Sequence, residues 1–182
     1  TDTDWDTAAN WTTTGVTDRV PTSADDVVIA DVTNNPIIGG GLNPEIKSLT
    51  IDSGGHLTAG ANVITINGET TGNYSFLNSG TFVSTSSTLT FTYDGATRMT
   101  GGALNNIIIN HASHETVLKS AATVAGDLTI TAGSFDTNAG SDFALTVDGD
   151  VSVTGTLRGR DSAISFGSLT IASGGTYSAT SG

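Results

Sequence analysis

Short segments in which an apolar, a polar and an apolar residue follow one another recur along most of the chain. In an extended backbone, the first and third side chains of such a triplet point to one face and the second points to the other. Each triplet therefore predicts a β-strand with one buried and one solvated face. The segments are Leu49–Ile51, Ile64–Ile66, Leu89–Phe91, Leu128–Ile130, Leu145–Val147, Val151–Val153 and Leu169–Ile171, together with the wholly apolar Ile107–Ile109.

Glycine-containing turns separate nearly all of these segments. Ser53-Gly54-Gly55 and Ser173-Gly174-Gly175 are the clearest, and Asn67-Gly68 and Asp94-Gly95 belong to the same class. Such residues tolerate the backbone conformations that tight turns require. No stretch combines a 3.6-residue apolar period with a helix cap, so the sequence predicts almost no helix.

Two segments of the chain are near copies of each other. Residues 48–59 and 168–179 are identical at eight of twelve aligned positions. Successive coils of a parallel β-helix stack equivalent positions directly, and so favour such self-similarity, whereas an antiparallel sandwich or barrel does not need it. The sequence therefore predicts an all-β fold, a parallel β-helix (β-solenoid) of about seven coils. Its inward-facing residues are expected to be Leu49, Ile51, Ile64, Ile66, Leu89, Phe91, Ile107, Ile109, Leu128, Ile130, Leu145, Val147, Leu169 and Ile171.

The first 45 residues differ from the rest of the chain. Both tryptophans, Trp5 and Trp11, precede the repeats, and Asn34-Asn35-Pro36 and Asn43-Pro44 mark loops. An end coil of a solenoid exposes apolar side chains and unpaired backbone groups, which large aromatic residues can cover. We therefore expect residues 1–45 to be an aromatic N-terminal capping segment and residues 46–182 to be solenoid repeats of one continuous domain.

Composition narrows the possible partners. Acidic residues outnumber basic ones 18 to 6, giving a formal charge of −12, which disfavours binding to nucleic acid or to anionic lipid. Charged residues make up only 13% of the chain, which contains no cysteine. No apolar run is long enough to cross a bilayer, so we expect no membrane insertion. The opening residues Thr1-Asp2-Thr3-Asp4 predict either a removed export signal or a segment of a longer protein.

The N-terminal pattern resembles that of a known class of proteins. Trp5 and Trp11, followed by Gly15, Pro21 and Asp26–Ile29, are similar to the opening of large secreted β-helix repeat proteins of bacteria and archaea, of the adhesin and autotransporter-passenger type. Residues 46–51 and 54–57 continue the similarity to this opening, and residues 145–151 and 155–157 are similar to the repeats of these proteins. The resemblance implies export, surface display and self-association, and it carries over no catalytic residues.

Candidate metal ligands are few. His111, His114 and Glu115 would share a face on a helix but not on a strand, and the preceding Ile107–Ile109 favours a strand, so a solvated loop is expected. His56 follows a Gly-Gly turn, where a surface position is expected.

Calcium is the one cofactor that the sequence leaves open. Its possible ligands are three acidic groups, none of which matches an EF-hand or a glycine-rich calcium repeat. They are Asp2, Asp4 and Asp6, then Asp25 and Asp26, and finally Asp148 and Asp150.

An enzyme acting on polysaccharides is the first rival function. It would need carboxylates and cationic groups gathered on one face of the rod. No motif brings the few basic residues into register with carboxylates, and Arg158-Gly159-Arg160-Asp161 is expected to be a loop of mixed charge. The basic residues are Lys47, Lys119, Arg19, Arg98, Arg158 and Arg160.

Binding of ice or of glycans is the second rival function. Pairs such as Thr88 and Thr90, Thr90 and Thr92, and Thr129 and Thr131 place hydroxyls on an outer face, but they look scattered over the coils. Asn10 and Asn73 lie in glycosylation sequons.

The leading hypothesis is a non-enzymatic, extracellular structural or adhesive element of a cell surface. Residues 168–182 copy an interior repeat and lack a capping helix or a charged terminator. The sequence therefore predicts head-to-tail association, with another copy or with adjacent repeats of a parent chain, and surface glycans as a further class of partner.

Overall fold

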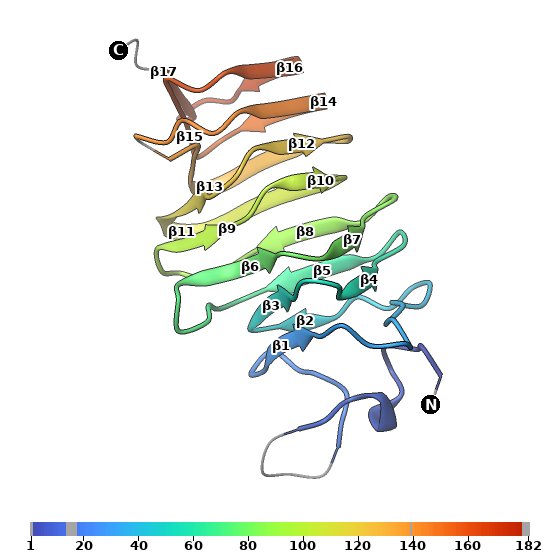
Figure 1. The fold of residues 1–182 in the computed structure, drawn as a ribbon. Helices are drawn as coiled ribbons and strands as arrows, with labels where there is room; N and C mark the ends of the chain where they lie inside the picture. Colours follow the sequence, from blue (N-terminus) through green and yellow to red (C-terminus); the bar gives the residue numbers. More distant parts are fainter. Residues whose placement is uncertain (1, 14–17, 139, 180–182) are drawn as a thin grey trace.

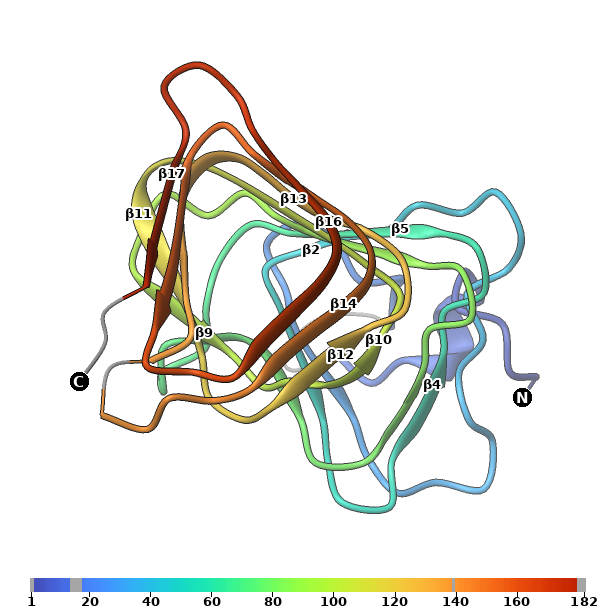
Figure 2. The same ribbon diagram turned by 90° about the horizontal axis from the view of Figure 1, so that it is seen from above.

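In a computed structural model, the chain is a rod of about seven stacked parallel coils with a roughly three-sided cross-section (Figures 1 and 2). The structure describes residues 2–13, 18–138 and 140–179. Gly15 and residues 180–182, on which parts of the resemblance and of the end-to-end prediction fall, lie outside these ranges. The predicted parallel β-solenoid is confirmed.

The first face of the rod is a ladder of parallel strands, one from each coil. Because β11 and β13 are long and bulged, their C-terminal parts belong to this face and their N-terminal parts to another. The strands are, in order, β1 (Asp26–Ile29), β3 (Ser48–Ile51), β6 (Tyr74–Asn78), β9 (Thr97–Met99), β11 (Asn106–Leu118), β13 (Leu128–Asp136), β15 (Thr156–Arg160) and β17 (Thr176–Ala179).

The other two faces are built in the same way. The second contains the two-stranded sheet of β4 (His56–Thr58) and β7 (Thr81–Val83), then β10 (Gly102–Leu104), β12 (Ala122–Val124) and the starts of β14 (Leu145–Val153) and β16 (Ile164–Ile171). The third contains β2 (Glu45–Ile46), β5 (Val63–Ile66), β8 (Thr88–Phe91) and the remaining parts of β11, β13, β14 and β16.

Alternation along the strands fills the interior as predicted. Twelve of the fourteen predicted inward side chains are at most 1% exposed, from Leu49 and Ile51 through Leu145 and Val147. Each fully buried aliphatic side chain contributes about 1.5–3 kcal/mol relative to exposure. The exceptions lie in the last described coil, where Leu169 is only partly buried and Ile171 is 46% exposed. No coil among the described residues stacks on them.

Glycine pairs turn the chain at two corners with similar local geometry. Gly54 and Gly174 have φ values of 84° and 91°, which favour glycine. A Cβ atom on the following glycine would lie 2.3 Å from the carbonyl oxygen of Ile29 at Gly55, and 2.2 Å from that of Val153 at Gly175. The second glycine therefore allows one coil to approach the next.

The two near copies in the sequence do not occupy equivalent places. Leu49 of the first copy stacks on Phe76 in the first face, whereas Leu169 of the second stacks on Val151 in the third face. The two matching segments therefore belong to different columns of stacked strands. The repeated unit is a strand, a Gly-Gly corner and a strand, and it can be used at more than one corner of the triangle.

The N-terminal segment closes one end of the rod. Trp5 is 1% exposed, and the backbone around it continues the second face, because Asp4 and Ile37 form a parallel bridge and Ile37 bridges to Thr58. β1, within residues 1–45, already pairs with β3. The boundary at residue 45 stays a prediction.

Helix is nearly absent from the described ranges, as expected. It is confined there to the single 3₁₀ turn η1 (Ala8–Asn10). In the part of the chain that the structure covers, no helix has the length and apolar character needed to cross a membrane.

Candidate functional site

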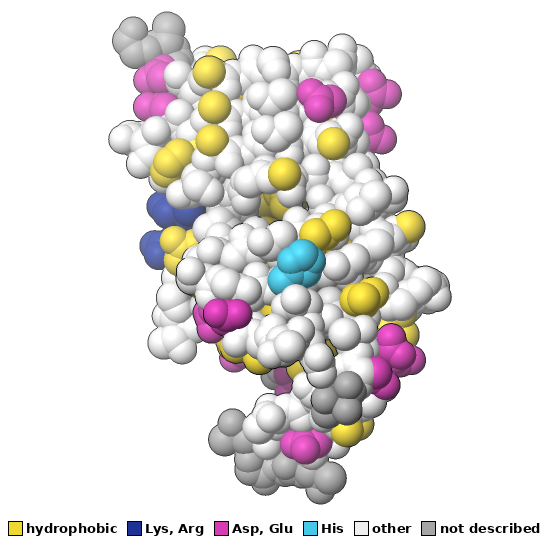
Figure 3. Space-filling model, turned by 45° about the vertical axis from the view of Figure 1, so that its right-hand side comes forward, with side chains coloured by type: hydrophobic (Ala, Val, Ile, Leu, Met, Phe, Trp, Pro, Cys, Tyr) yellow, Lys and Arg dark blue, Asp and Glu magenta, His cyan; other side chains and the backbone are white. Residues whose placement is uncertain are grey.

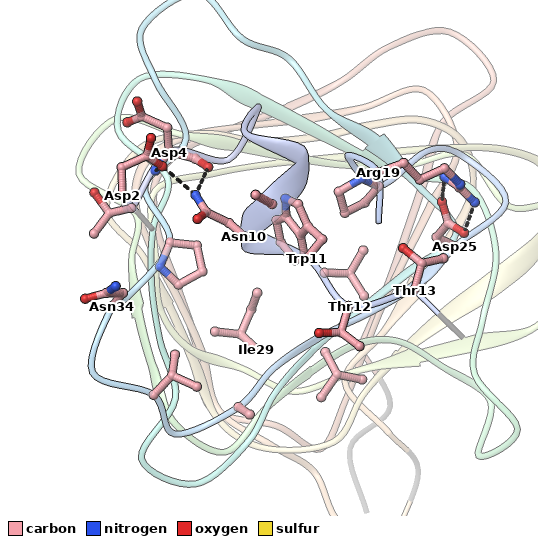
Figure 4. A pocket seen from close by; sticks show the side chains of 18 of the residues that line it. Asp2, Asp4, Asn10, Trp11, Thr12, Thr13, Arg19, Asp25, Ile29 and Asn34 are labelled. Atoms are coloured by element: carbon pink, nitrogen blue, oxygen red, sulfur yellow. Dashed lines mark hydrogen bonds and ion pairs between the residues drawn. The ribbon is translucent and has the colours of Figure 1, made fainter. Parts of the chain in front are cut away.

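A cavity of about 850 Å³ lies at the N-terminal end of the rod and is lined by residues between 2 and 36, including strand β1 (Figure 4). Cavities of this size are typical of small-molecule sites, which span about 300–1,000 Å³. Ile29 of β1 and the exposed side chains of Val28 and Val32 supply apolar lining. Polar groups come from residues 2–13 and from the loop before β1.

Trp11 projects toward the middle of this cavity (Figure 4). Its indole Nε1 donates a hydrogen bond to the carbonyl oxygen of Trp5 at 2.7 Å, and the two rings meet edge to face with centroids 4.6 Å apart. The buried Trp5 thus fixes the position of Trp11, which itself stays partly exposed. This arrangement presents a rigid aromatic surface to the cavity.

One wall of the cavity carries Asp2 and Asp4, two members of the first predicted calcium group. Asn10 Nδ2 donates to Asp2 Oδ1 at 2.6 Å and to the backbone oxygen of Asp4 at 2.8 Å. The hydrogen bond from Asn10 and that from the backbone of Asp4 lower the pKa of Asp2. Asp2 is therefore a carboxylate already engaged with the capping segment.

The opposite wall carries an ion pair between Arg19 and Asp25 (Figure 4). Both terminal nitrogens of Arg19 donate to the Asp25 carboxylate at 2.6 Å, and the Thr22 backbone N–H adds a third hydrogen bond at 2.7 Å. The hydrogen bond from Arg19 is the largest cause that lowers the pKa of Asp25 to about 2. The ion pair thus connects the start and the end of the loop before β1.

Acid should release this ion pair. Because the pKa of Asp25 in the folded chain lies near 2, below its usual value of 3.8, its stabilisation is present above about pH 4 and is lost as the pH falls toward 2. We expect Asp25→Asn to lower stability at neutral pH and to flatten the loss between pH 4 and 2. Urea midpoints measured from pH 2 to 7 check this, with the exposed Asp31→Asn as control. An unchanged acid slope in Asp25→Asn would contradict the assignment.

A second cluster of charged groups lies on the outer side of the first face. Arg158 donates to Glu115, and Arg160 donates through Nε and Nη2 to Asp136. Residues 158–160 are part of strand β15, so the expected loop of mixed charge was wrong. The expectation that no basic residues align with carboxylates was also wrong, since Arg158 is the register partner of Asp136.

The pKa values of the two carboxylates in this cluster are shifted in opposite directions, upward for Glu115 and downward for Asp136. Burial, followed by repulsion from Asp136, raises the pKa of Glu115 against the attraction of Arg158. Burial also opposes ionisation of Asp136, but hydrogen bonds from Arg160 and from the Asn138 backbone hold its pKa below the usual value. Both arginines are therefore matched by carboxylates, and the cluster is a closed set of ion pairs.

The three histidines differ in exposure and in hydrogen-bond partners. His111, His114 and Glu115 all lie within strand β11, so the expected solvated loop was wrong, and His111 is only 2% exposed. Its Nε2 lies 3.1 Å from Thr116 Oγ1, and burial lowers its pKa. His114 is exposed and pairs with Asp94 at 3.0 Å, and His56 is partly exposed, as expected. His111 and His114 thus point into different surroundings.

Hydroxyl side chains line up on the outer side of the third face. Thr65 pairs with Thr90, and the same column continues through Ile108 to Thr129, Ser152 and Thr170. One threonine of each predicted pair, Thr90 or Thr129, therefore stacks in a single column. Thr88 is in register with Val63 and Asn106, so the pairs themselves are not repeated on successive coils. Figure 3 shows another side of the rod, on which uncharged polar groups and backbone predominate, with scattered hydrophobic and acidic side chains, basic side chains at one edge and a histidine.

The remaining acidic candidates are spread over the rod. Asp26 accepts from Lys47 Nζ and Ser48 Oγ, and Asp150 accepts from Ser168 Oγ. Within residues 2–13, 18–138 and 140–179, no three metal-ligating side chains converge. Calcium binding stays a prediction. Of the two sequon residues, Asn73 is exposed, whereas the Asn10 amide is held by Asp2.

Comparison with known proteins supplies a family and no activity. No curated protein and no solved structure matches this chain. Residues 1–101 match the family described as a domain of unknown function, DUF8693. This match covers more than half of the 182 residues and includes the whole N-terminal cavity, whereas Glu115, Asp136, Arg158 and Arg160 lie beyond it. The chain belongs to the DUF8693 family.

Proposed function

We propose that this chain is a non-enzymatic structural and adhesive element of an extracellular surface, in which coils stack end to end into a longer rod. The observation that carries the proposal is the uncovered face of the last described coil. Ile171 is 46% exposed, whereas Val153, its partner in the coil below, is fully buried. Leu169, Phe166 and Tyr177 are also only partly buried.

Stacking of a further parallel coil on this surface would be more favourable than leaving the surface exposed to water. β16 and β17 each pair with a strand on one side only within the described residues, so they present free backbone donors and acceptors. Burying an Ile or Leu side chain contributes about 1.5–3 kcal/mol, and the new backbone hydrogen bonds add to this. The coil can come from a second copy or from residues of the parent chain beyond 182.

The other parts of the proposal rest on composition and pairing. An acidic, threonine-rich surface with few charges suits an exposed rod, and the resemblance to secreted β-helix repeat proteins supports extracellular display. Pairing of Arg158 with Glu115 and of Arg160 with Asp136 supports a structural role for the charged cluster, because each guanidinium is already neutralised.

Association of the 182-residue chain tests the stacking. We expect elongated oligomers by electron microscopy and concentration-dependent sedimentation. Ile171→Lys should weaken the association constant at least about tenfold, because it replaces an apolar contact worth more than about 1.4 kcal/mol with a charge. Leu169→Lys should act in the same direction.

The matched control is Val63→Lys, which changes a 37% exposed aliphatic residue on the side of the rod. It should leave association unchanged. A chain that remains monomeric at millimolar concentration, with its last coil protected in hydrogen exchange, would contradict the proposal.

Binding of a flat polar surface such as ice or glycan is a second candidate, favoured by the stacked column of Thr65, Thr90, Thr129 and Thr170. Ile108 interrupts this column. The exposed carboxylates of Asp127 and Asp150 flank it. An apolar residue within the column and carboxylates beside it weaken the case for a flat hydroxyl-bearing binding surface. The uncovered end coil has no comparable feature against it, so stacking remains the first proposal.

A further inference from the structure

We infer that the cavity at the N-terminal end is a binding site for a neutral sugar unit. This goes beyond the stacking function and does not depend on it, because the cavity and the uncovered coil lie at opposite ends of the rod (Figure 1). Three features point to this class of ligand: a fixed aromatic surface, hydrogen-bonding groups around it, and the sign of the charge.

The aromatic surface is Trp11. Its N–H group is already used by the carbonyl of Trp5, so only its ring faces and edges remain for contacts in the cavity. The apolar C–H face of a pyranose ring packs on such a surface, while the sugar hydroxyls remain at its rim. Trp5 fills the core beneath, which leaves Trp11 partly exposed and available.

Hydrogen-bonding groups surround Trp11 on several sides (Figure 4). The carboxylates of Asp2 and Asp4 lie on one wall, and the hydroxyls of Thr12 and Thr13 lie on another. Carboxylates accept hydrogen bonds only, and threonine hydroxyls both donate and accept. Sugar hydroxyls, which do both as well, can satisfy this combination.

The charge of the lining separates neutral sugars from acidic ones. Four carboxylates line the cavity, those of Asp2, Asp4, Asp25 and Asp26, against the single guanidinium of Arg19. That guanidinium is held by Asp25 at 2.6 Å. Asp26 is in turn paired with Lys47 at 2.9 Å. An anionic ligand, such as a uronate or a sugar phosphate, would still meet the negative carboxylates of Asp2 and Asp4.

Titration of the whole chain with simple sugars tests the site. The probes are methyl glucoside, methyl galactoside, methyl mannoside and N-acetylglucosamine, with galacturonate and lysine as anionic and cationic comparisons. We expect saturable quenching or shift of tryptophan fluorescence, and matching heats of binding, with at least one neutral probe. Trp11→Ala should weaken that binding about tenfold or more, and Trp11→Phe should restore part of it.

A variant that blocks the cavity without touching the core makes the test independent of folding. Val32→Trp changes a 48% exposed residue in the cavity lining, and Val63→Trp changes a 37% exposed residue outside it. We expect Val32→Trp to abolish binding and Val63→Trp to leave it intact. Absence of saturable binding by every neutral probe at tens of millimolar overturns the inference. So does tighter binding of galacturonate or lysine, or binding that Val32→Trp leaves unchanged.

Discussion

Gly80→Ala should lower the free energy of unfolding by about 3 kcal/mol, the upper part of the range for overpacked sites. Gly80 lies in the turn between β6 and β7. A Cβ atom there would sit 2.3 Å from the carbonyl oxygen of Gly55, 2.4 Å from that of Asp52 and 2.9 Å from Ile51 Cγ2. The first two oxygens already accept backbone hydrogen bonds, from Thr81 and Gly55. The turn must therefore move away from the coil below.

Gly40→Ala is the matched control. A Cβ atom at Gly40 would have no heavy atom within 4 Å, and its backbone does not need glycine. This variant should be neutral or gain up to about 1 kcal/mol through a less flexible unfolded chain. Urea denaturation of both variants gives the difference in free energy. Equal stabilities of Gly80→Ala and Gly40→Ala would show that the coils are not packed as closely at this corner as the structure has them.

The strands and their buried faces could be predicted from sequence because alternation is a local property. Leu89 and Phe91, or Leu128 and Ile130, point inward whatever coil they belong to. Ile171 has the same local pattern but is exposed, because burial at the end of a rod depends on the next layer, which the pattern does not encode. The Gly-Gly turns could likewise be predicted from the sequence. Which corner of the triangle each turn occupies could not.

The charged cluster could not be predicted because the coils differ in length. Leu49 pairs with Phe76 and Leu89 with Ile107, so no constant spacing brings distant residues into one column. Glu115 and Arg158 are 43 residues apart and meet two coils along the rod. The one local signal was the Arg-Gly-Arg alternation at 158–160, which on a strand places both arginines on the same face.

The cavity escaped prediction for a different reason. Trp5 and Trp11 were both expected to cover the end of the rod, and the sequence does not distinguish them. In the structure Trp5 is buried, while Trp11, fixed by the Trp5 carbonyl, is left partly exposed beside an open volume. The difference in burial between the two tryptophans depends on how the segment packs across the end of the rod, which is determined by tertiary structure and not by the local sequence.

Asp136→Asn should be the most damaging change among the charged residues. The Asp136 side chain is 3% exposed and accepts hydrogen bonds from Arg160 and from the Asn138 backbone at 2.7 Å. Removing one partner of a buried pair costs about 3–5 kcal/mol, but an exposed pair is worth less than about 1. Since Arg160 remains about one-third exposed, at 32%, we expect a loss of about 2 kcal/mol. The exposed Asp148→Asn should change stability little.

The same substitution should also change how stability depends on pH, through Glu115. Burial and the repulsion of Asp136 raise the pKa of Glu115 above its usual 4.5, so its protonated form favours the fold. This contribution is fully present below about pH 4.5 and is lost as the pH rises through the higher pKa of the folded state. With Asp136 neutralised, its repulsion disappears and burial acts on Glu115 against the attraction of Arg158, so the loss of stability with rising pH should become smaller.

Urea midpoints from pH 4 to 7, compared with those of Glu115→Gln, measure this loss of stability. If Asp136→Asn and the natural chain lose stability equally over this range, the two carboxylates do not interact, and the ion pairs of Arg158 and Arg160 are independent of each other.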